Sequence, residues 1–161
     1  SVCVQDGQFV TFQPKVERKG LLGLFGKRNK PQPPVQTPYL VGFVGLWYMA
    51  GEAHIVSIAV RESHRRKGLG ELLLIGALEM GMRRDCQVLT LEARVSNFIA
   101  HRLYQKYDFK SVGIRKGYYA DNREDAVIMT TSSIDTEEYR KLFKELQEAY
   151  EARWGKFVVG D

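Results

Sequence analysis

The stretch HIVSIAV (54–60), followed after a short interval by RRKGLG (65–70), determines how this sequence folds. The first run is rich in β-branched residues and is typical of a strand. The second run is polar and contains two glycines, so it indicates a tight turn. Apolar residues then recur at helical spacing: Leu69, Leu72, Leu73, Ala77 and Met80. We therefore predict a strand over 54–60 and a helix over about 68–84, joined by a glycine turn.

The segments on either side of this unit extend it into a sheet. An Asp6-Gly7 turn or bulge interrupts the first of them. Further strands are expected at 2–12, 39–49, 87–93, 109–114 and 126–130. The short turn after residue 49 predicts an antiparallel hairpin, whereas the strand–helix–strand order in the middle predicts a parallel pair. The expected fold class is α/β (α+β), with a mixed, mostly antiparallel sheet and a central parallel strand pair flanked by helices.

Two further helices complete the predicted fold. The expected N-terminal caps are Ser96 or Asn97 for a helix over 98–107, and a capping-box pair, Asp135 with Glu138, for a helix over 135–154. The last helix carries an apolar stripe that ends at Trp154. This stripe either packs on the core of the domain or binds a partner. We favour packing, because an amphipathic helix usually covers its own core.

Length and composition exclude several classes of protein. The chain has 161 residues, 44% hydrophobic and 27% charged, which suits one globular domain with a core of its own. No apolar run approaches the roughly 20 residues that span a bilayer. The cysteines, Cys3 and Cys86, form neither a zinc motif nor a disulfide framework, and the three histidines lack metal-ligand spacing. We expect a cytoplasmic protein with reduced thiols and without a metal.

The positive charge of the chain is concentrated in one segment. The net charge is +5, and residues 14–38 hold six basic residues against the single acid Glu17, which accounts for all of it. The same segment contains all five prolines, so neither helix nor sheet is expected to persist there. We predict a basic loop inserted between two strands. It is either a solvated excursion or a surface that contacts RNA, the ribosome or a membrane.

Three features of the sequence carry chemistry. The glycines of RRKGLG (65–70) let backbone N–H groups approach an anion such as a pyrophosphate, with a purely structural turn as the alternative. Glu92 ends an apolar strand and Tyr104 lies on the next helix. As a pair, the carboxylate can accept a proton from a nucleophile while the phenol donates one to a leaving group. Considered separately, Glu92 is explained as an exposed acid at a strand end and Tyr104 as a tyrosine of the core. Tyr118 and Tyr119 are either hairpin packing or a lip over a peptide substrate.

Taken together, three stretches resemble the GNAT (GCN5-related N-acetyltransferase) family, and within it the protein N-terminal acetyltransferases of the RimI/Ard1 type. The first is the strand and glycine turn over 54–70. The second is LEARVSN (91–97) with Tyr104 on the following helix. The third is GYY (117–119) with EDA (124–126) and Met129, which resembles the final hairpin of the alanine N-acetyltransferases of ribosomal proteins. The resemblance covers about residues 39–131.

The resemblance implies acetyl-CoA as the donor of the acetyl group and no metal. It assigns the cofactor to Ile58, Ala59 and Val60 for the pantetheine arm, to Arg65, Arg66, Lys67, Gly68, Leu69 and Gly70 for the pyrophosphate, and to Asn97 at the head of its helix. It makes Glu92 the general base and Tyr104 the general acid. The substrate amine would attack the thioester directly, with no covalent enzyme intermediate. Tyr118 and Tyr119 would contact the peptide.

The predicted reaction is acetyl transfer to the N-terminal α-amine of a protein, of the ribosomal-protein alanine type. An α-amine has a pKa near 8 and a lysine one near 10.4, so a modest base suffices for the α-amine. Two alternatives stay open. One is an enzyme of the same fold that acts on a small-molecule amine. The other is a non-catalytic ribosome- or RNA-binding module that uses residues 14–38.

The chain departs from the family pattern in several places. Relatives usually open with a strand and two helices before the position where this sequence begins, and they commonly have glycine where this chain has Asp108. The basic insert at 14–38 is also unusual. We therefore divide the chain into an acetyltransferase-like domain (1–134), which contains the insert, and a C-terminal helical extension (135–161).

Overall fold

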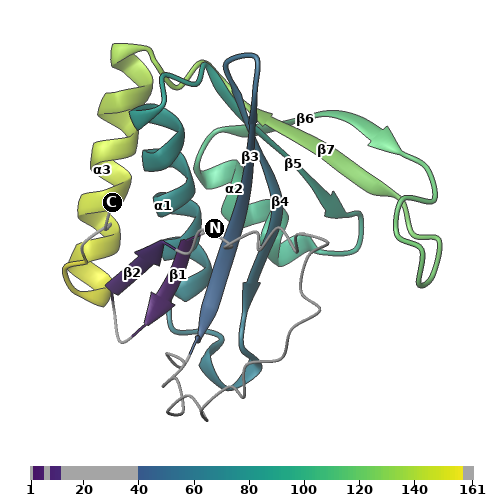
Figure 1. The fold of residues 1–161 in the computed structure, drawn as a ribbon, viewed down its shortest axis with the longest axis horizontal. Helices are drawn as coiled ribbons and strands as arrows, with labels where there is room; N and C mark the ends of the chain where they lie inside the picture. The colour runs from purple at the N-terminus through teal and green to yellow at the C-terminus, as the bar shows by residue number, and fades with distance from the viewer. Residues whose placement is uncertain (1, 6–7, 12–39, 158–161) are drawn as a thin grey trace, which may run out of the picture.

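The computed structural model describes residues 2–5, 8–11 and 40–157 of the chain. In this part of the chain, seven strands form one mixed sheet in the order β2-β1-β3-β4-β5-β7-β6 (Figure 1). The strands are β1 (Val2–Gln5), β2 (Gln8–Thr11), β3 (Gly42–Met49), β4 (Glu52–Val60), β5 (Val88–Arg94), β6 (Phe109–Arg115) and β7 (Ala126–Thr131). The helices are α1 (Leu69–Arg83), α2 (Phe98–Lys106) and α3 (Glu137–Trp154), and a short 3-10 turn, η1, spans Glu62–His64. The predicted fold class is confirmed.

The pairing of the strands confirms the predicted connectivity. β3 and β4 form an antiparallel hairpin, β4 and β5 pair in parallel, and β7 lies antiparallel between β5 and β6. The segment predicted as one interrupted strand is a strand pair, because β1 and β2 are antiparallel to each other and β1 also pairs with β3. The Asp6-Gly7 turn and the insert at 14–38 lie outside the described residues, so the loop stays a prediction there.

The parallel pairing between β4 and β5 is short. It ends with Ile55 opposite Leu91, although β4 continues to Val60. The register of β4 against β3 shifts at the same place, because Ile55 and Ser57 are paired and Val56 between them is not. Such a bulge bends a strand and increases its twist. β4 therefore turns away from β5 (Figure 1), and its last residues have no neighbouring strand on that side within the described part of the chain.

The two faces of the sheet differ because successive strand residues point in opposite directions. On β5, Leu91 and Ala93 are buried in the core that α1 and α2 cover. Glu92 lies between them and therefore points to the opposite face, called the open face because no helix of the described residues covers it. On β4 the bulge brings Ile58 and Val60 onto the helix side, where they pack against the core. The ends of these two strands thus present different chemistry to the two faces.

Helix α3 packs its apolar stripe into the same core, which confirms the packing interpretation. Tyr139, Phe143 and Tyr150 are buried, and α3 lies alongside α1 (Figure 1). The Tyr139 hydroxyl donates a hydrogen bond to the carbonyl oxygen of Tyr107 at 2.9 Å. The ring of Phe143 contacts the ring of Tyr107, with centroids 6.5 Å apart. These contacts join α3 to the end of α2.

The start of α3 differs from the prediction. The N-cap is Thr136, whose Oγ1 accepts a hydrogen bond from the backbone N–H of Tyr139 at 3.2 Å. The predicted capping box of Asp135 and Glu138 is therefore wrong by one residue. The physical reason is the extended backbone of Thr136, with ψ at 152°, which places its hydroxyl over the free amides of the first turn.

The last residue of α3 lies on the predicted glycine turn. Gly68 has a φ of 75°, a conformation that strains residues with a side chain. A Cβ added to Gly68 would lie 2.8 Å from the indole ring of Trp154, which is closer than real Cβ contacts allow. Backbone conformation and contact with the indole ring therefore both require glycine here, and α3 braces the turn from outside.

We expect Gly68→Ala to lower the free energy of unfolding by about 2–4 kcal/mol. About 1–2 kcal/mol comes from the left-handed backbone and a similar amount from overpacking against the indole ring. In a Trp154→Ala background only the backbone contribution remains, so the same substitution should cost about half as much. Denaturant unfolding of the wild type, both single variants and the double variant measures this difference. Equal costs in the two backgrounds would contradict the steric role of Trp154.

Candidate active site

The turn between β4 and α1 presents free backbone donors. Arg66 and Gly68 both have positive φ, 61° and 75°, and α1 begins directly after them at Leu69. The backbone N–H of Leu72 donates to the carbonyl oxygen of Gly68 at 2.9 Å, so the amides that precede it in the helix have no helical acceptor. Gly68 has no side chain that could cap them. Because the helix dipole adds positive potential at this end, the turn can bind an anion.

A cleft of about 530 Å³ leads from this turn, along the end of β4, to α2. The residues that line it are Ile58, Ala59 and Val60 from β4, Arg65 from the turn, Gly70 from the start of α1, and Asn97, Ile99, Ala100, Leu103 and Tyr104 from α2 and its start. The structure therefore brings six of the predicted cofactor residues, and the predicted general acid, to one cleft. The other predicted cofactor residues belong to the turn without lining the cleft: Arg66, Lys67, Gly68 and Leu69.

Asn97 begins α2 and confirms the predicted cap. Its Oδ1 accepts a hydrogen bond from the backbone N–H of Ala100 at 3.2 Å. Because the helix uses the carbonyl end of this side chain, its amide end is the part that can donate to a bound molecule. Ser96, the other cap candidate, instead donates its backbone N–H to Oε1 of Glu124 at 2.9 Å.

Tyr104 is the buried phenol of the cleft. The residue is 6% exposed, and its ring lies against that of Phe109, with centroids 5.7 Å apart. Burial raises the pKa of Tyr104 to about 12, and the nearby Tyr119 adds to the rise. The phenol therefore keeps its proton at neutral pH and is available as a proton donor to a group that forms beside it.

Glu92 lies on the open face of the sheet, in a second cavity of about 350 Å³. Its Oε2 is 2.8 Å from Nε2 of His54, and its Oε1 is 3.2 Å from Nε of Arg115. The side chain of Glu92 is 5% exposed, so these partners replace hydrogen bonds that water would otherwise make. The other residues that line this cavity are Trp47, Met49, Glu52, Val56, Thr90 and Tyr118.

The predicted base and the predicted acid line separate cavities. Tyr104 lines the cleft on the helix side, and Glu92 lines the cavity on the open face. Glu92 is the first residue of β5 after its pairing with β4 ends at Leu91. It therefore lies beside the gap between the two strands, where the two sides of the sheet meet. This arrangement suits transfer between two molecules that enter from opposite faces.

His54 and Arg115 are candidates that reasoning from the sequence missed. The histidine spacing was informative only about metals. A usable signal was nevertheless present, because parallel pairing places His54 opposite Thr90, two residues before Glu92 and on the same face. Arg115 comes from β6 at the far edge of the sheet. Its approach to Glu92 depends on tertiary structure, and no local pattern indicates it.

Tyr118 and Tyr119 have different surroundings. Tyr118 is 45% exposed and lines the cavity of Glu92, so it can contact an acceptor. Tyr119 is half-buried, with the guanidinium carbon of Arg94 3.8 Å from the centre of its ring. Its hydroxyl donates a hydrogen bond to the backbone carbonyl oxygen of Glu92 at 3.5 Å. Of the two interpretations, hairpin packing describes Tyr119, and the geometry of a lip fits Tyr118.

Neither a metal site nor a membrane span is found in the described residues. Among them, no three His, Cys, Asp or Glu side chains gather closely enough to hold a metal ion. No helix in residues 40–157 combines the length and apolar character that crossing a membrane requires.

The loop between β6 and β7 (residues 116–125, the β6–β7 loop) contains acids with lowered pKa values. Hydrogen bonds from Ser96, and then from Arg94, lower the pKa of Glu124 to about 2. The backbone N–H of Gly117 donates to Asp125 Oδ1 at 2.8 Å, and this bond, with Lys116, lowers the pKa of Asp125. Both carboxylates therefore stay charged at neutral pH and hold backbone amides in place.

We expect these contacts to be insensitive to pH near neutrality and to be lost in acid. Because the folded pKa of Glu124 lies below its ordinary value of 4.5, its contribution is fully present above that value and is lost as the pH falls toward about 2. The amide chemical shifts of Ser96 and Gly117, measured by NMR, should be constant from about pH 8 to pH 5 and change only below that range. A midpoint above about pH 5 would contradict the assigned hydrogen bonds.

The sequence and the fold both resemble known acetyltransferases. The model of the acetyltransferase (GNAT) family matches residues 15–109. The chain is 48% identical over 80 residues to the N-alpha-acetyltransferase of Saccharolobus solfataricus, covering 48% of this chain and 47% of that protein. It is 41% identical over 80 residues to the ribosomal protein bS18-alanine N-acetyltransferase of Escherichia coli, covering 48% of this chain and 54% of that protein. The chain thus spans about half the length of these curated relatives.

A solved structure shows the same likeness in three dimensions. The crystal structure of the ribosomal-protein-S18-alanine N-acetyltransferase from Escherichia coli superposes with a TM-score of 0.55 at 35% sequence identity. The match covers 60% of this chain and 64% of that one.

Proposed function

Because the chain belongs to the acetyltransferase (GNAT) family, we propose that it transfers the acetyl group of acetyl-CoA to the N-terminal α-amine of a protein. The observation that carries this proposal is the pair of cavities beside the gap between β4 and β5, with Tyr104 in one and Glu92 in the other. Similar proteins named N-alpha-acetyltransferase and ribosomal protein bS18-alanine N-acetyltransferase support the class of acceptor.

The cleft on the helix side has the features that acetyl-CoA requires. The free amides at the start of α1 suit its pyrophosphate, and Arg65 adds a fixed positive charge in the same cleft. The open edge of β4 at Ile58–Val60 suits the amides of the pantetheine arm, which can pair with it as a strand would. Asn97 and the apolar side chains of α2 form the opposite wall.

The acceptor amine approaches from the open face. Its nitrogen attacks the thioester carbon, a C–N bond forms and the C–S bond breaks. Glu92 accepts the proton that the amine loses, directly or through a water molecule, and Tyr104 gives its proton to the departing thiolate. His54 and Arg115 hold the carboxylate of Glu92 from two sides, so it is oriented before the amine arrives.

An α-amine suits this site better than a lysine does. An α-amino group has a pKa near 8, so an appreciable fraction is already neutral at pH 7, whereas a lysine with a pKa near 10.4 costs roughly 3 kcal/mol more to deprotonate. The finer proposal is an acceptor that begins with alanine or a similarly small residue, such as a ribosomal protein, in the cytoplasm. Tyr118 beside Glu92 would contact the start of that chain.

Incubation of the full chain with acetyl-CoA and a pool of peptides tests the proposal. Each peptide carries a free α-amine, a varied first residue and an internal lysine, and mass spectrometry locates the acetyl group. We expect it on the α-amine, with small first residues preferred. Acetylation of the lysine alone would contradict the proposal. No acetylation of any peptide would also contradict it and would favour a small-molecule amine or the RNA-binding alternative.

We expect Glu92→Gln and Tyr104→Phe each to lower kcat by about 10²- to 10⁴-fold, the usual contribution of a general base or acid. Acetyl-CoA affinity, measured by calorimetry, should change less than about threefold, because neither substitution alters the turn or the edge of β4. Tyr150→Phe is the matched control for the phenol, since Tyr150 is also buried, with a pKa raised to about 12, but lies outside the cleft. Glu137→Gln is the control for the acid. Full activity of either site variant would refute its assigned role.

A further inference from the structure

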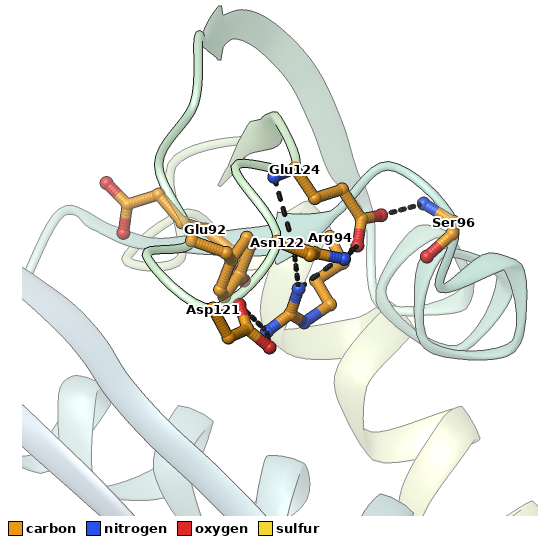
Figure 2. A network of polar contacts seen from close by, with 7 residues as sticks. Glu92, Arg94, Ser96, Asp121, Asn122 and Glu124 are labelled. Atoms are coloured by element: carbon orange, nitrogen blue, oxygen red, sulfur yellow. Dashed lines mark hydrogen bonds and ion pairs between the residues drawn. The ribbon is translucent and has the colours of Figure 1, made fainter.

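The side chain of Arg94, the last residue of β5, binds several residues of the β6–β7 loop (Figure 2). Its Nη2 donates to both carboxylate oxygens of Asp121, at 2.9 and 2.8 Å. Its Nη1 donates to Oδ1 of Asn122 at 3.0 Å and to Oε2 of Glu124 at 3.1 Å. One guanidinium therefore binds three side chains that lie within four residues of the same loop.

The same guanidinium also reaches the aromatic pair of this loop. It lies over the ring of Tyr119, whose hydroxyl donates to the backbone carbonyl of Glu92. The rings of Tyr119 and Tyr118 meet edge to face, with centroids 5.2 Å apart, and Tyr118 lines the cavity of Glu92. An unbroken series of contacts thus runs from Arg94 to the wall of the acceptor cavity.

Arg94 is also what keeps the acids of the loop together. Asp121 and Glu124 both carry negative charge, and without a cation between them they would repel each other. Glu124 in addition accepts the backbone N–H of Ser96, which ties the loop to the residues that follow β5. Lysine could supply the charge but not the geometry, because arginine presents five donors in a rigid planar fork that matches a carboxylate bidentately.

We propose that Arg94 is a positioning residue that holds the β6–β7 loop, and with it Tyr118 and Tyr119, in the conformation that receives the acceptor. This inference rests on the proposed function. The Glu92 carboxylate points away from the Arg94 guanidinium (Figure 2), so Arg94 acts on the loop and not on the reacting atoms. Arg94 is not among the residues that line the cleft on the helix side. Its loss therefore affects the acceptor and spares acetyl-CoA.

Steady-state kinetics with both substrates varied test this assignment. We expect Arg94→Gln and Arg94→Lys to lower kcat/KM for the acceptor peptide about 10- to 100-fold, mainly through a higher KM, because displaced contact groups misalign a substrate. The KM for acetyl-CoA should stay within about twofold. Asp121→Asn, an exposed loop substitution, should raise the peptide KM in the same direction by about threefold.

Lys116→Gln is the matched control, because it removes another ion pair of the same loop, 2.9 Å from Asp125, without touching the aromatic pair. Its kinetics should equal those of the wild type within about twofold. A purely stabilising role for Arg94 would lower kcat in proportion to the folded fraction and leave the peptide KM unchanged. That result, or an equal rise in KM for both substrates, would overturn the proposal.

Hydrogen exchange separates a failure of this inference from a failure of the proposed function. Arg94→Gln should speed exchange at the amides of Gly117 and Tyr119, which donate to Asp125 and to Glu124 within the loop, while the amides of β5 keep their protection. If the wild type acetylates no α-amine, the proposed function fails. Hydrogen exchange alone then tests whether Arg94 holds the β6–β7 loop in place. Unchanged exchange overturns the role of Arg94 whatever the activity.

Discussion

The early end of the pairing between β4 and β5 is the constraint on which the candidate site depends. Four residue pairs join β4 to β5. Directly after them, Val56 of β4 has no paired residue on β3. Had the pairing continued, the backbone groups of Ile58–Val60 on this edge would bond to β5 and be closed to a ligand. An open edge is ordinarily a liability, because it invites another strand. Beside a glycine turn and a buried tyrosine, the same edge becomes a place for an extended molecule that carries amides of its own.

The sheet also keeps the candidate acid and base apart. Tyr104 lies on the helix side, where burial raises its pKa to about 12, and Glu92 lies on the open face between His54 and Arg115. Strand alternation on β5 places Glu92 on the face opposite to its buried neighbours Leu91 and Ala93, while Tyr104 lies on α2, which covers the face of those neighbours.

Much of this arrangement is encoded locally, and the remainder depends on contacts between distant segments. Short-range sequence patterns predict the strand over 54–60, the turn over 65–70 and the cap at Asn97, and the structure contains all three. The bulge at Val56 has no such signal within β4 itself, because the glycine that marks it, Gly45, lies on β3, where an added Cβ would be 3.2 Å from Cγ2 of Val56. The N-cap of α3 could not be predicted from the sequence either. Asp135 and Thr136 are both good N-cap residues, and the backbone conformation decides which of them caps the helix.

The side-chain clusters were the least predictable part. Arg115 reaches Glu92 from the far edge of the sheet, and Trp154 reaches Gly68 from the last turn of α3. In both cases the partners are separated by many residues in the chain, so no spacing within a motif connects them. Charge and size alone do not identify such partners until the sheet order and the helix packing are known.

The two sides of the gap are held by different forces, and the difference corresponds to what each side binds under the proposed function. On the donor side, Trp154 packs on Gly68, and close packing of this kind admits little movement. On the acceptor side, Arg94 and the acids of the β6–β7 loop make exposed ion pairs, which are individually weak and are weakened further by salt. A rigid contact suits a turn that meets the same pyrophosphate in every reaction. Several weak polar contacts suit a loop whose partner, the start of another protein, varies in shape, because single contacts can break and re-form while the fork of Arg94 keeps the loop in place.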